Sequence, residues 1–273
     1  HLCYTYLFFM VTNKLKHHGS YAFPCGIILK FGRTDYLLVF GLSLVVNMPY
    51  PSISSIPKAL RKLLTSLDFE SRFKGKGPVA VKVHMGERGN RAYVHPSYVA
   101  IVVKLLKDLG CEPFVTDTTS LYEGSRSDAI SHLRTSAENG FTYANVGAPT
   151  IIADGVHGSD GVKLKFEGFD VKEAIIAKAL YDADGFVVVS HGKGHVFSGF
   201  AGAIKNVGMG FGTKEFKRYL HETTKPFINH DKCTRCERCV EACGFKALKI
   251  VSGKVEKDFG RCVGCGACMY VCA

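Results

Sequence analysis

Residues 79–87 read Val-Ala-Val-Lys-Val-His-Met-Gly-Glu, a short β-branched run followed directly by polar residues and a glycine. Such a run is typical of a buried strand that ends in a loop. A clearer run of the same kind, Gly185–Ser190, ends at His191. Two shorter strand-like stretches follow the same rule, Pro113–Thr116 before Asp117 and Thr150–Ala153 before Asp154.

Helical patterns lie between these strands. Pro96–Leu109 is apolar at helical spacing and stops at Gly110, while Asp128–Asn139 and Val171–Tyr181 are further predicted helices. Strands that alternate with helices indicate crossover units. We therefore predict an α/β fold with a mostly parallel sheet flanked by helices.

Polar residues follow each predicted strand. In parallel sheets, ligands bind beyond the carboxyl ends of the strands. His84, Asp117, Asp154 and His191 stand at those ends and are expected to gather along one edge.

The segment 191–210 is rich in glycine and histidine. Its glycines permit a ligand to approach the backbone closely, and its spacing matches neither the P-loop nor the dinucleotide fingerprint. The alternative is that the glycines form a tight turn and that the histidines make hydrogen bonds only with nearby groups of the chain. Under the functional interpretation the candidates are cofactor-binding Gly192, Gly194, Gly199 and Gly202, and catalytic or metal-binding His84, His191, His195 and Lys205.

Eight of the 11 cysteines lie at the C-terminal end, in two runs with Cys-x2-Cys-x2-Cys-x3-Cys spacing. Three thiolates spaced this way wrap one iron–sulfur cube, and the fourth cysteine of each run binds the other cube. We predict two [4Fe–4S] clusters. The predicted ligands are Cys233, Cys236, Cys239 and Cys272 for cluster one, and Cys262, Cys265, Cys268 and Cys243 for cluster two. A pair of zinc sites is the alternative.

The cysteine pattern resembles that of bacterial two-cluster ferredoxins. Those proteins have proline after the fourth cysteine, where this chain has Gly244 and Ala273. The stretches 247–250 and 254–256 predict a hairpin between the runs, and its symmetric counterpart would follow Cys272. We therefore expect a small ferredoxin-like α+β module that is truncated.

The α/β part resembles the domain of unknown function 362 family, whose members are described as Fe–S centre proteins. The residues that carry the resemblance are Lys82–Glu87, Gly147–Pro149, Ile152–Gly155, His191–His195, Gly202–Gly210 and the cysteine runs. The resemblance covers about residues 48–273. It implies an α/β domain fused to a two-cluster ferredoxin, with no settled substrate.

The net charge of the chain indicates which kinds of partner it could bind. The chain has 35 Lys and Arg against 24 Asp and Glu, a net charge of +11. This favours a redox partner protein or a small anionic substrate, although a solvated basic surface explains it as well. No basic stretch interleaved with aromatics indicates specific nucleic-acid binding, and no apolar run reaches the roughly 18–20 residues of a membrane span. Clustered thiols of the metal-ligand kind predict a reducing, cytoplasmic location.

The predicted domains are 1–47, 48–225 and 226–273. Residues 1–47 mix apolar runs with charges and lack the order of a signal peptide. We interpret them as an atypical extension that is not native, with a natural start near Met48. A membrane-associated extension is the alternative. The second domain is the α/β part and the third is the 4Fe–4S ferredoxin-type part.

Three functions fit these features. The first is an iron–sulfur oxidoreductase whose clusters transfer single electrons to a site at the strand edge. The second is a non-catalytic electron carrier. The third is a metal- or cofactor-maturation protein with an anion or metal site at His191 and His195.

Overall fold

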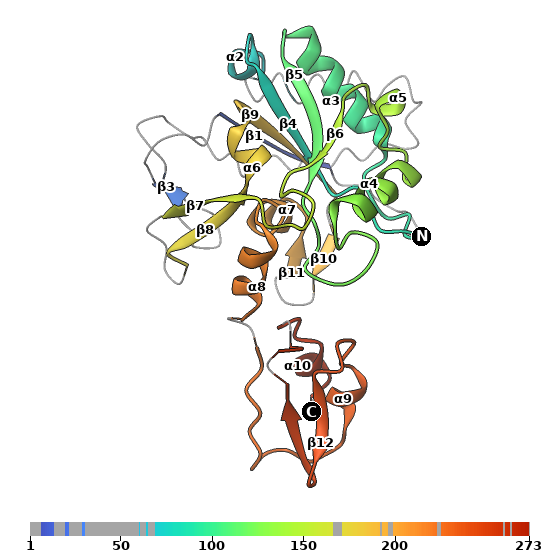
Figure 1. The fold of residues 1–273 in the computed structure, drawn as a ribbon, viewed down its shortest axis with the longest axis vertical. Helices are drawn as coiled ribbons and strands as arrows, with labels where there is room; N and C mark the ends of the chain where they lie inside the picture. The colour runs from blue at the N-terminus through green and yellow to red at the C-terminus, as the bar shows by residue number, and fades with distance from the viewer. Residues whose placement is uncertain are drawn as a thin grey trace. The chain divides into compact units, whose positions relative to one another are not determined.

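A five-stranded sheet forms the centre of the N-terminal part (Figure 1). The computed structural model describes residues 7–13, 20–21, 29–30, 60, 64, 69–165, 171–191, 193–195, 199–222, 225–258, 260–262 and 264–272. The sheet has the strand order β1-β9-β4-β5-β6. Its strands are β1 (Leu7–Asn13), β4 (Pro78–Val83), β5 (Glu112–Asp117), β6 (Thr150–Ile152) and β9 (Gly185–His191).

Four strands of this sheet run parallel, and β1 pairs antiparallel with β9 at the edge. Val81 of β4 is in register with Val115 of β5 and Val187 of β9. Because alternate residues of a strand face opposite sides, this register places the valines together on one face. The predicted α/β fold with a mostly parallel sheet is confirmed.

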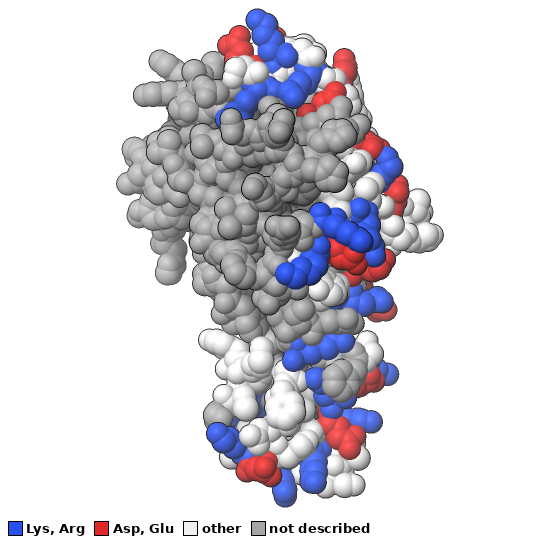
Figure 2. Space-filling model, turned by 90° about the vertical axis from the view of Figure 1, so that its left-hand side faces the viewer, with Lys and Arg blue, Asp and Glu red and all other residues white. Residues whose placement is uncertain are grey.

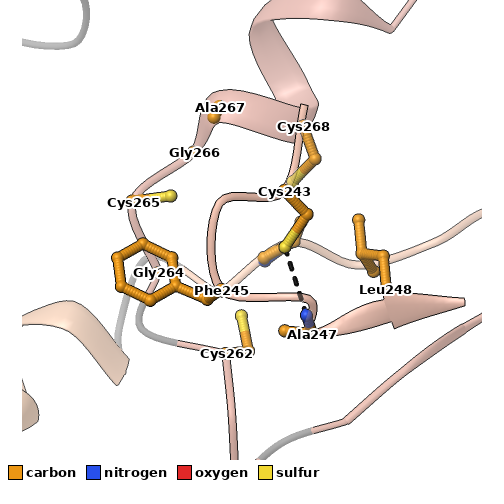
Figure 3. Close-up of a pocket in the computed structure, with 11 residues that line it drawn as sticks. Cys243, Phe245, Ala247, Leu248, Cys262, Gly264, Cys265, Gly266, Ala267 and Cys268 are labelled. Carbon is orange, nitrogen blue, oxygen red and sulfur yellow. Dashed lines mark hydrogen bonds between the residues drawn. The ribbon is translucent and has the colours of Figure 1, made fainter. Parts of the chain in front are cut away.

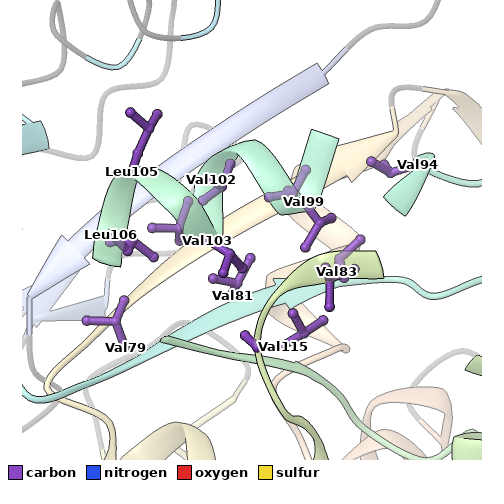
Figure 4. Packing of buried hydrophobic residues seen from close by; sticks show 14 of the residues in the cluster. Val79, Val81, Val83, Val94, Val99, Val102, Val103, Leu105, Leu106 and Val115 are labelled. Atoms are coloured by element: carbon purple, nitrogen blue, oxygen red, sulfur yellow. The ribbon is translucent and has the colours of Figure 1, made fainter. Parts of the chain in front are cut away.

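Helices cover both faces of the sheet. One core packs Val79, Val81 and Val83 against α3 (Pro96–Asp108), as Figure 4 shows. The same core includes residues of α2 (Phe69–Phe73), α4 (Ala129–Glu138) and α5 (Tyr143–Val146). The second core packs the other face against α6 (Lys178–Asp182), with Val207 of α7 (Ala203–Gly208) beside it.

Local signals fix the ends of the two longer helices. His95 caps α3 by accepting a hydrogen bond from the Ser97 N–H, and Pro96 occupies its first turn. Asp128 caps α4 by accepting a 2.9 Å hydrogen bond from the Ser131 N–H. These boundaries agree with the predicted helices.

The helix predicted at Val171–Tyr181 is wrong in its first half. Residues Glu173–Ala177 form strand β8, which pairs antiparallel with β7 (Gly161–Lys165), and helix α6 begins only at Lys178. A short apolar run is compatible with either a strand or a helix by its spacing. Pairing with β7, a contact that is distant in sequence, decides for the strand.

The described chain divides into two compact units, His1–Lys214 and Glu215–Ala273. Helix α8 (Lys214–Glu222) begins at the division. In the second unit, β12 (Leu248–Val251) and β13 (Lys254–Lys257) form the predicted hairpin. Its two turn residues, Ser252 and Gly253, both have positive φ, as tight hairpin turns require.

The remaining strands are short pairs. They are β2 (Ser20–Tyr21) with β3 (Leu29–Lys30), and β10 (Lys193–His195) with β11 (Gly199–Ala201). No helix in the described part of the chain is long and apolar enough to cross a membrane. On the face drawn in Figure 2, the described Lys and Arg residues are interspersed with Asp and Glu.

Candidate functional site

Two loops of the second unit carry the eight cysteines. The first loop, residues 233–243, contains the short helix α9 (Arg238–Glu241). The second loop, residues 262–272, contains α10 (Ala267–Val271). When the two cysteine runs are aligned, the two helices begin at the same position and end one residue apart, so the loops have closely similar backbones.

Both loops use the left-handed backbone region at the same two positions. In the first loop these are Arg235 (φ 57°) and Glu237 (φ 60°), and in the second they are Gly264 (φ 64°) and Gly266 (φ 73°). Backbone that changes between negative and positive φ forms concave nests of N–H groups, which suit anionic centres such as iron–sulfur clusters. Glycine adopts this conformation without strain, whereas Arg and Glu do not.

The second loop surrounds a pocket together with one cysteine from the first. Cys243, Cys262, Cys265 and Cys268 all line it. Figure 3 shows the sulfurs of Cys262 and Cys265 directed into the same space. The rest of the lining is mostly apolar and small: Pro226, Phe245, Ala247, Leu248, Gly264, Gly266 and Ala267.

A backbone donor already points at one of these sulfurs. The N–H of Ala247 donates a hydrogen bond to Cys243 Sγ at 3.3 Å. Such N–H···S bonds are among the features that tune an iron–sulfur centre. Four thiols, a nearby amide and an apolar lining make a donor set that fits a [4Fe–4S] cluster.

Electrostatic interactions also link particular thiols of the two loops. Burial and then the charges of Cys265 and Cys262 raise the pKa of Cys268. Burial and then the charges of Cys272 and Cys233 raise the pKa of Cys239. The last cysteine of the second loop therefore lies near members of the first run, as Cys243 lies near the second.

The loops differ in exposure. Cys236 and Cys272 are exposed, whereas the other six cysteines of the loops are half-buried. The Arg238 N–H and the Thr234 hydroxyl lower the pKa of Cys236 by hydrogen bonding to its thiolate. The thiols associated with the first run are thus more open to solvent than those of the second.

Within the described residues, no group of three or more His, Cys, Asp or Glu side chains is arranged to hold one metal ion. A tetrahedral zinc holds all its thiolates at about 2.3 Å from a single point. In an iron–sulfur cube, each thiolate binds a different iron, so the sulfurs stand farther apart. A zinc ion and a cube therefore require different separations of their thiolates.

A second polar cluster lies at the carboxyl ends of β4 and β5. The Lys82 ammonium is 1% exposed and lies 2.7 Å from Asp117 Oδ1. It also donates a 2.6 Å hydrogen bond to Asn206 Oδ1 of α7. The side-chain amide of Asn206 in turn donates hydrogen bonds to Ser190 Oγ and to the Val189 carbonyl. These bonds connect α7 with β9.

Further charges surround Asp117. His132 Nε2 and Arg126 Nη1 each lie 3.6 Å from Asp117 Oδ2. Arg126 is also paired with Glu87. Although desolvation opposes it, attraction to Lys82 and then His132 lowers the pKa of Asp117 far below its ordinary range. The carboxylate is therefore ionised, and Lys82 and Arg126 balance Asp117 and Glu87.

His132 is the least satisfied member of this cluster. Its side chain is fully buried and neither ring nitrogen has a hydrogen-bond partner. Burial lowers the pKa of His132 to about 4, against the opposing attraction of Asp117. The imidazole is therefore neutral near pH 7.

The strand order brings the predicted edge residues to one side of the sheet. His84 follows β4, Asp117 and His191 end β5 and β9, and Asp154 lies just beyond β6. Asp154 is buried and accepts hydrogen bonds from the Thr119 N–H and hydroxyl. His84 is exposed, although the atoms packed around it and the charge of Arg126 lower its pKa to about 4.

The glycine-rich segment is described in part. His195 pairs with Gly199, and Gly194 with Phe200, in the β10–β11 pair. Gly202 (φ 115°) precedes α7, and Lys205 is exposed on that helix. Gly192 and the side chain of His195 lie outside the described residues. A catalytic or cofactor-binding role for these residues stays a prediction.

Sequence reasoning missed four residues of the buried cluster, which are Lys82, Arg126, His132 and Asn206. One signal was available, because Lys82 interrupts an otherwise apolar strand. A lysine at such a position is rarely buried without a partner. His132 gave no signal of its own, because its burial depends on how α4 packs against the sheet.

Comparison with known proteins gives two matches. The family model described as "Domain of unknown function (DUF362)" matches residues 79–261, from β4 to just before Cys262. The chain is also similar to the pyruvate synthase subunit PorD of Methanothermobacter marburgensis, with 33% identity over 60 residues. That stretch is 22% of this chain and 70% of the subunit. No solved structure matches the chain.

Proposed function

The chain belongs to the DUF362 family, and from this premise we propose that it is an iron–sulfur protein that transfers single electrons through two [4Fe–4S] clusters. When bound, each cluster takes up and releases one electron. The clusters would serve a redox site in the α/β domain. The cytoplasmic location stays a prediction.

One observation carries the proposal. Cys243 lines the same pocket as Cys262, Cys265 and Cys268, although it is 19 or more residues away in sequence. An exchange of the fourth ligand is what a two-cluster module requires. If each cysteine run bound its own zinc ion, Cys243 would be expected to lie with the other cysteines of the first run.

The residues around this pocket have separate tasks. The four thiolates would bind the four irons of cluster two. The Ala247 N–H, already directed at Cys243 Sγ, would stabilise the negative charge of that thiolate. Phe245 and Leu248 line the pocket and exclude water, which affects the potential of a bound cluster.

Cluster one would be held by Cys233, Cys236, Cys239 and Cys272. The electrostatic contact of Cys239 with Cys272 and Cys233 supports this set. Iron binding removes the repulsion between these thiolates, because each sulfur then shares its charge with a cation.

The relative in M. marburgensis is a subunit of pyruvate synthase, so it acts within an assembly. We carry this over as the expectation that the present chain exchanges electrons with a partner protein. A small anionic substrate at the strand edge is the other expected partner. Its candidate contacts are His84, His191, His195 and Lys205.

A non-catalytic carrier is the second candidate, and one observation favours it. Charged groups of the buried cluster pair with one another, with Lys82 bound to both Asp117 and Asn206. A lysine and a carboxylate that are paired within the chain are less available to act on a substrate. In that case the α/β unit would dock a partner.

Metal and sulfide analysis tests the proposal. Anaerobically reconstituted protein should contain about eight iron and eight sulfide per chain, with paramagnetic resonance signals of reduced [4Fe–4S] clusters. Cys239→Ala and Cys268→Ala should each lose about four of the irons. Cys111→Ala, which removes a buried thiol outside the loops, is the control and should lose none. Stoichiometric zinc without sulfide would refute the proposal.

A further inference from the structure

The turn after β4 holds the imidazole of His84 in one protonation pattern. The Gly86 N–H donates a 3.0 Å hydrogen bond to His84 Nδ1. Because a backbone N–H can only donate, Nδ1 carries no proton, and the proton of the neutral ring lies on Nε2. The Asn139 side chain fixes the turn by donating a 2.8 Å hydrogen bond to the Met85 carbonyl. His84 is an exposed residue, so its Nε2–H group is a donor that a ligand can use.

The guanidinium of Arg126 is held in place but not fully used. Its Nε donates a 2.7 Å hydrogen bond to Glu87 Oε1, and its Nη2 is paired with the same oxygen. Its Nη1 lies 3.6 Å from Asp117 Oδ2, which is beyond hydrogen-bonding distance. Within the described residues, Asp117 Oδ2 has no hydrogen-bond partner. The Arg126 side chain is 13% exposed, so Nη1 is a second donor available to a ligand.

The charges around His84 favour an anion there. Burial is the main cause of the lowered pKa of His84, and four charged side chains then act on the ring. Arg126 acts on the ring more strongly than Asp117. Lys82 likewise acts more strongly than Glu87. The two cations therefore outweigh the two carboxylates at the imidazole, and a small anion would be attracted to it.

Resting on the proposed substrate site at the strand edge, we infer that His84 and Arg126 together bind the carboxylate of a small substrate. The carboxylate oxygens would accept hydrogen bonds from His84 Nε2–H and from Arg126 Nη1, and the bond to the guanidinium is of the strong, charge-assisted kind. A phosphate dianion suits the place less well. Asp117 and Glu87 lie next to the guanidinium and would repel its second charge.

The groups behind this pair are positioning residues. Asp117 Oδ1 accepts hydrogen bonds from Lys82 Nζ at 2.7 Å and from the Thr118 N–H at 2.8 Å. The carboxylate is thus bound through Oδ1, which leaves Arg126 Nη1 to a ligand. His132 is fully buried and neutral near pH 7, so it adds no charge to the site.

Nuclear magnetic resonance of the reconstituted full chain, with labelled histidine and acetate as the probe, tests this inference. At constant ionic strength, acetate should move the ring resonances of His84 until they saturate. It should also raise the pKa of His84 above about 4, because a bound anion favours the protonated ring. The ring resonances of His157, an exposed histidine outside this cluster, should not move. Acetamide, which has a similar shape but no charge, should bind about tenfold more weakly or less.

Two arginine variants separate the site from general charge. Arg126→Gln should weaken acetate binding by about tenfold or more, because a charge-assisted hydrogen bond is lost. Arg88→Gln is the matched control, since it removes an exposed arginine that is paired with Glu138, and it should leave the affinity unchanged. If Arg126→Gln does not fold, the titration of the wild-type protein still decides the question.

Three results would overturn the inference: no saturable movement of the His84 resonances, equal binding of acetate and acetamide, or tighter binding of phosphate than of acetate. Failure of the proposed function is distinct from these. A chain that holds about eight irons but binds no acetate refutes the carboxylate site alone. A chain without iron and sulfide refutes the proposed electron transfer, whether or not acetate binds.

Discussion

Lys82 and Asp117 at the sheet edge are almost fully buried and 2.7 Å apart, whereas Cys236 and Cys272 in the second unit are exposed. The sheet edge has its charges paired by the chain itself. The cysteine loops bring thiols together, and burial and then the charges of neighbouring thiols raise the pKa of Cys239 and of Cys268. The first region therefore pairs most of its buried charges within the chain, while the second gathers thiols whose ionisation is opposed by burial and by one another.

The two regions also differ in core. The sheet packs apolar side chains on both faces. Among described residues 225–272, the buried aliphatic side chains are Ala247, Leu248 and Val255. Segments of about 50 residues rarely bury enough apolar surface to fold alone, and metals often supply the missing stability.

Removal of the metal should have the largest effect and should separate the two regions. After iron is extracted with a chelator, amides at 225–272 should lose protection from hydrogen exchange, because cluster binding contributes most of the folding free energy there. Amides of β4 and β5 should keep theirs. Exchange mass spectrometry measures both in one sample. Equal loss of amide protection in both regions would mean that they do not differ in their dependence on the metal.

A smaller effect is expected from breaking the buried pair. Asp117→Ala leaves Lys82 buried without its carboxylate and should lower the free energy of unfolding by about 3–5 kcal/mol. The iron content should stay the same. Far-UV circular dichroism in urea measures the change, and metal analysis measures the iron.

Two controls sharpen this prediction. Glu138→Ala breaks the exposed pair with Arg88 and should cost about 0–1 kcal/mol. Lys82→Met combined with Asp117→Leu removes both buried charges and should cost less than Asp117→Ala alone. A double variant as unstable as the single one would mean that the pair itself is needed for folding.

The sheet edge should also respond to acid. His132 has a pKa near 4 in the fold and about 6.5 when unfolded, so the unfolded chain binds more protons between these values. Stability therefore falls as the pH drops from about 6.5 to 4, by on the order of 3 kcal/mol. Asp117, whose pKa is lowered in the fold, adds to the loss below about pH 4.

Urea unfolding at a series of pH values tests the histidine. His132→Gln should reduce the slope between pH 6.5 and 4, because glutamine does not titrate, and His84, whose pKa is also lowered to about 4, should account for the slope that remains. His157→Gln, which changes an exposed histidine, is the matched control. A slope that His132→Gln does not alter would assign the acid sensitivity to another group.

The sequence was informative where chemistry is local. The apolar runs predicted β4, β5, β6 and β9. The spacing of the cysteines predicted the two ligand sets, which stay predictions, and Cys243 lines one pocket with Cys262, Cys265 and Cys268. Helix α3 was predicted from apolar residues at helical spacing and from the glycine that follows it. These signals lie within a few residues of the elements they determine.

Contacts between distant residues could not be predicted in this way. Strand β8 was taken for a helix because its partner β7 was not recognised. The buried cluster joins Lys82, His132 and Asn206 from three separate elements, and their meeting depends on the packing of α4 and α7 against the sheet. The different exposure of Cys236 and Cys265 also comes from tertiary packing, since both runs have the same spacing.

The smallest expected effect lies within the second unit, between its two loops. Gly264→Ala with Gly266→Ala places side chains at φ 64° and 73°, which costs about 1–2 kcal/mol per residue. Arg235→Gly with Glu237→Gly removes the same strain from the first loop, and the greater backbone entropy of glycine offsets about 0.5–1 kcal/mol per residue. The first pair should lower the guanidinium midpoint at which cluster absorbance is lost, and the second pair should raise it slightly. Each variant keeps all eight cysteines. Midpoints that move in opposite directions in the two variants would therefore be due to the backbone conformation of the loops. Midpoints that shift in the same direction would mean that the loops are held by their clusters alone, whatever their φ angles.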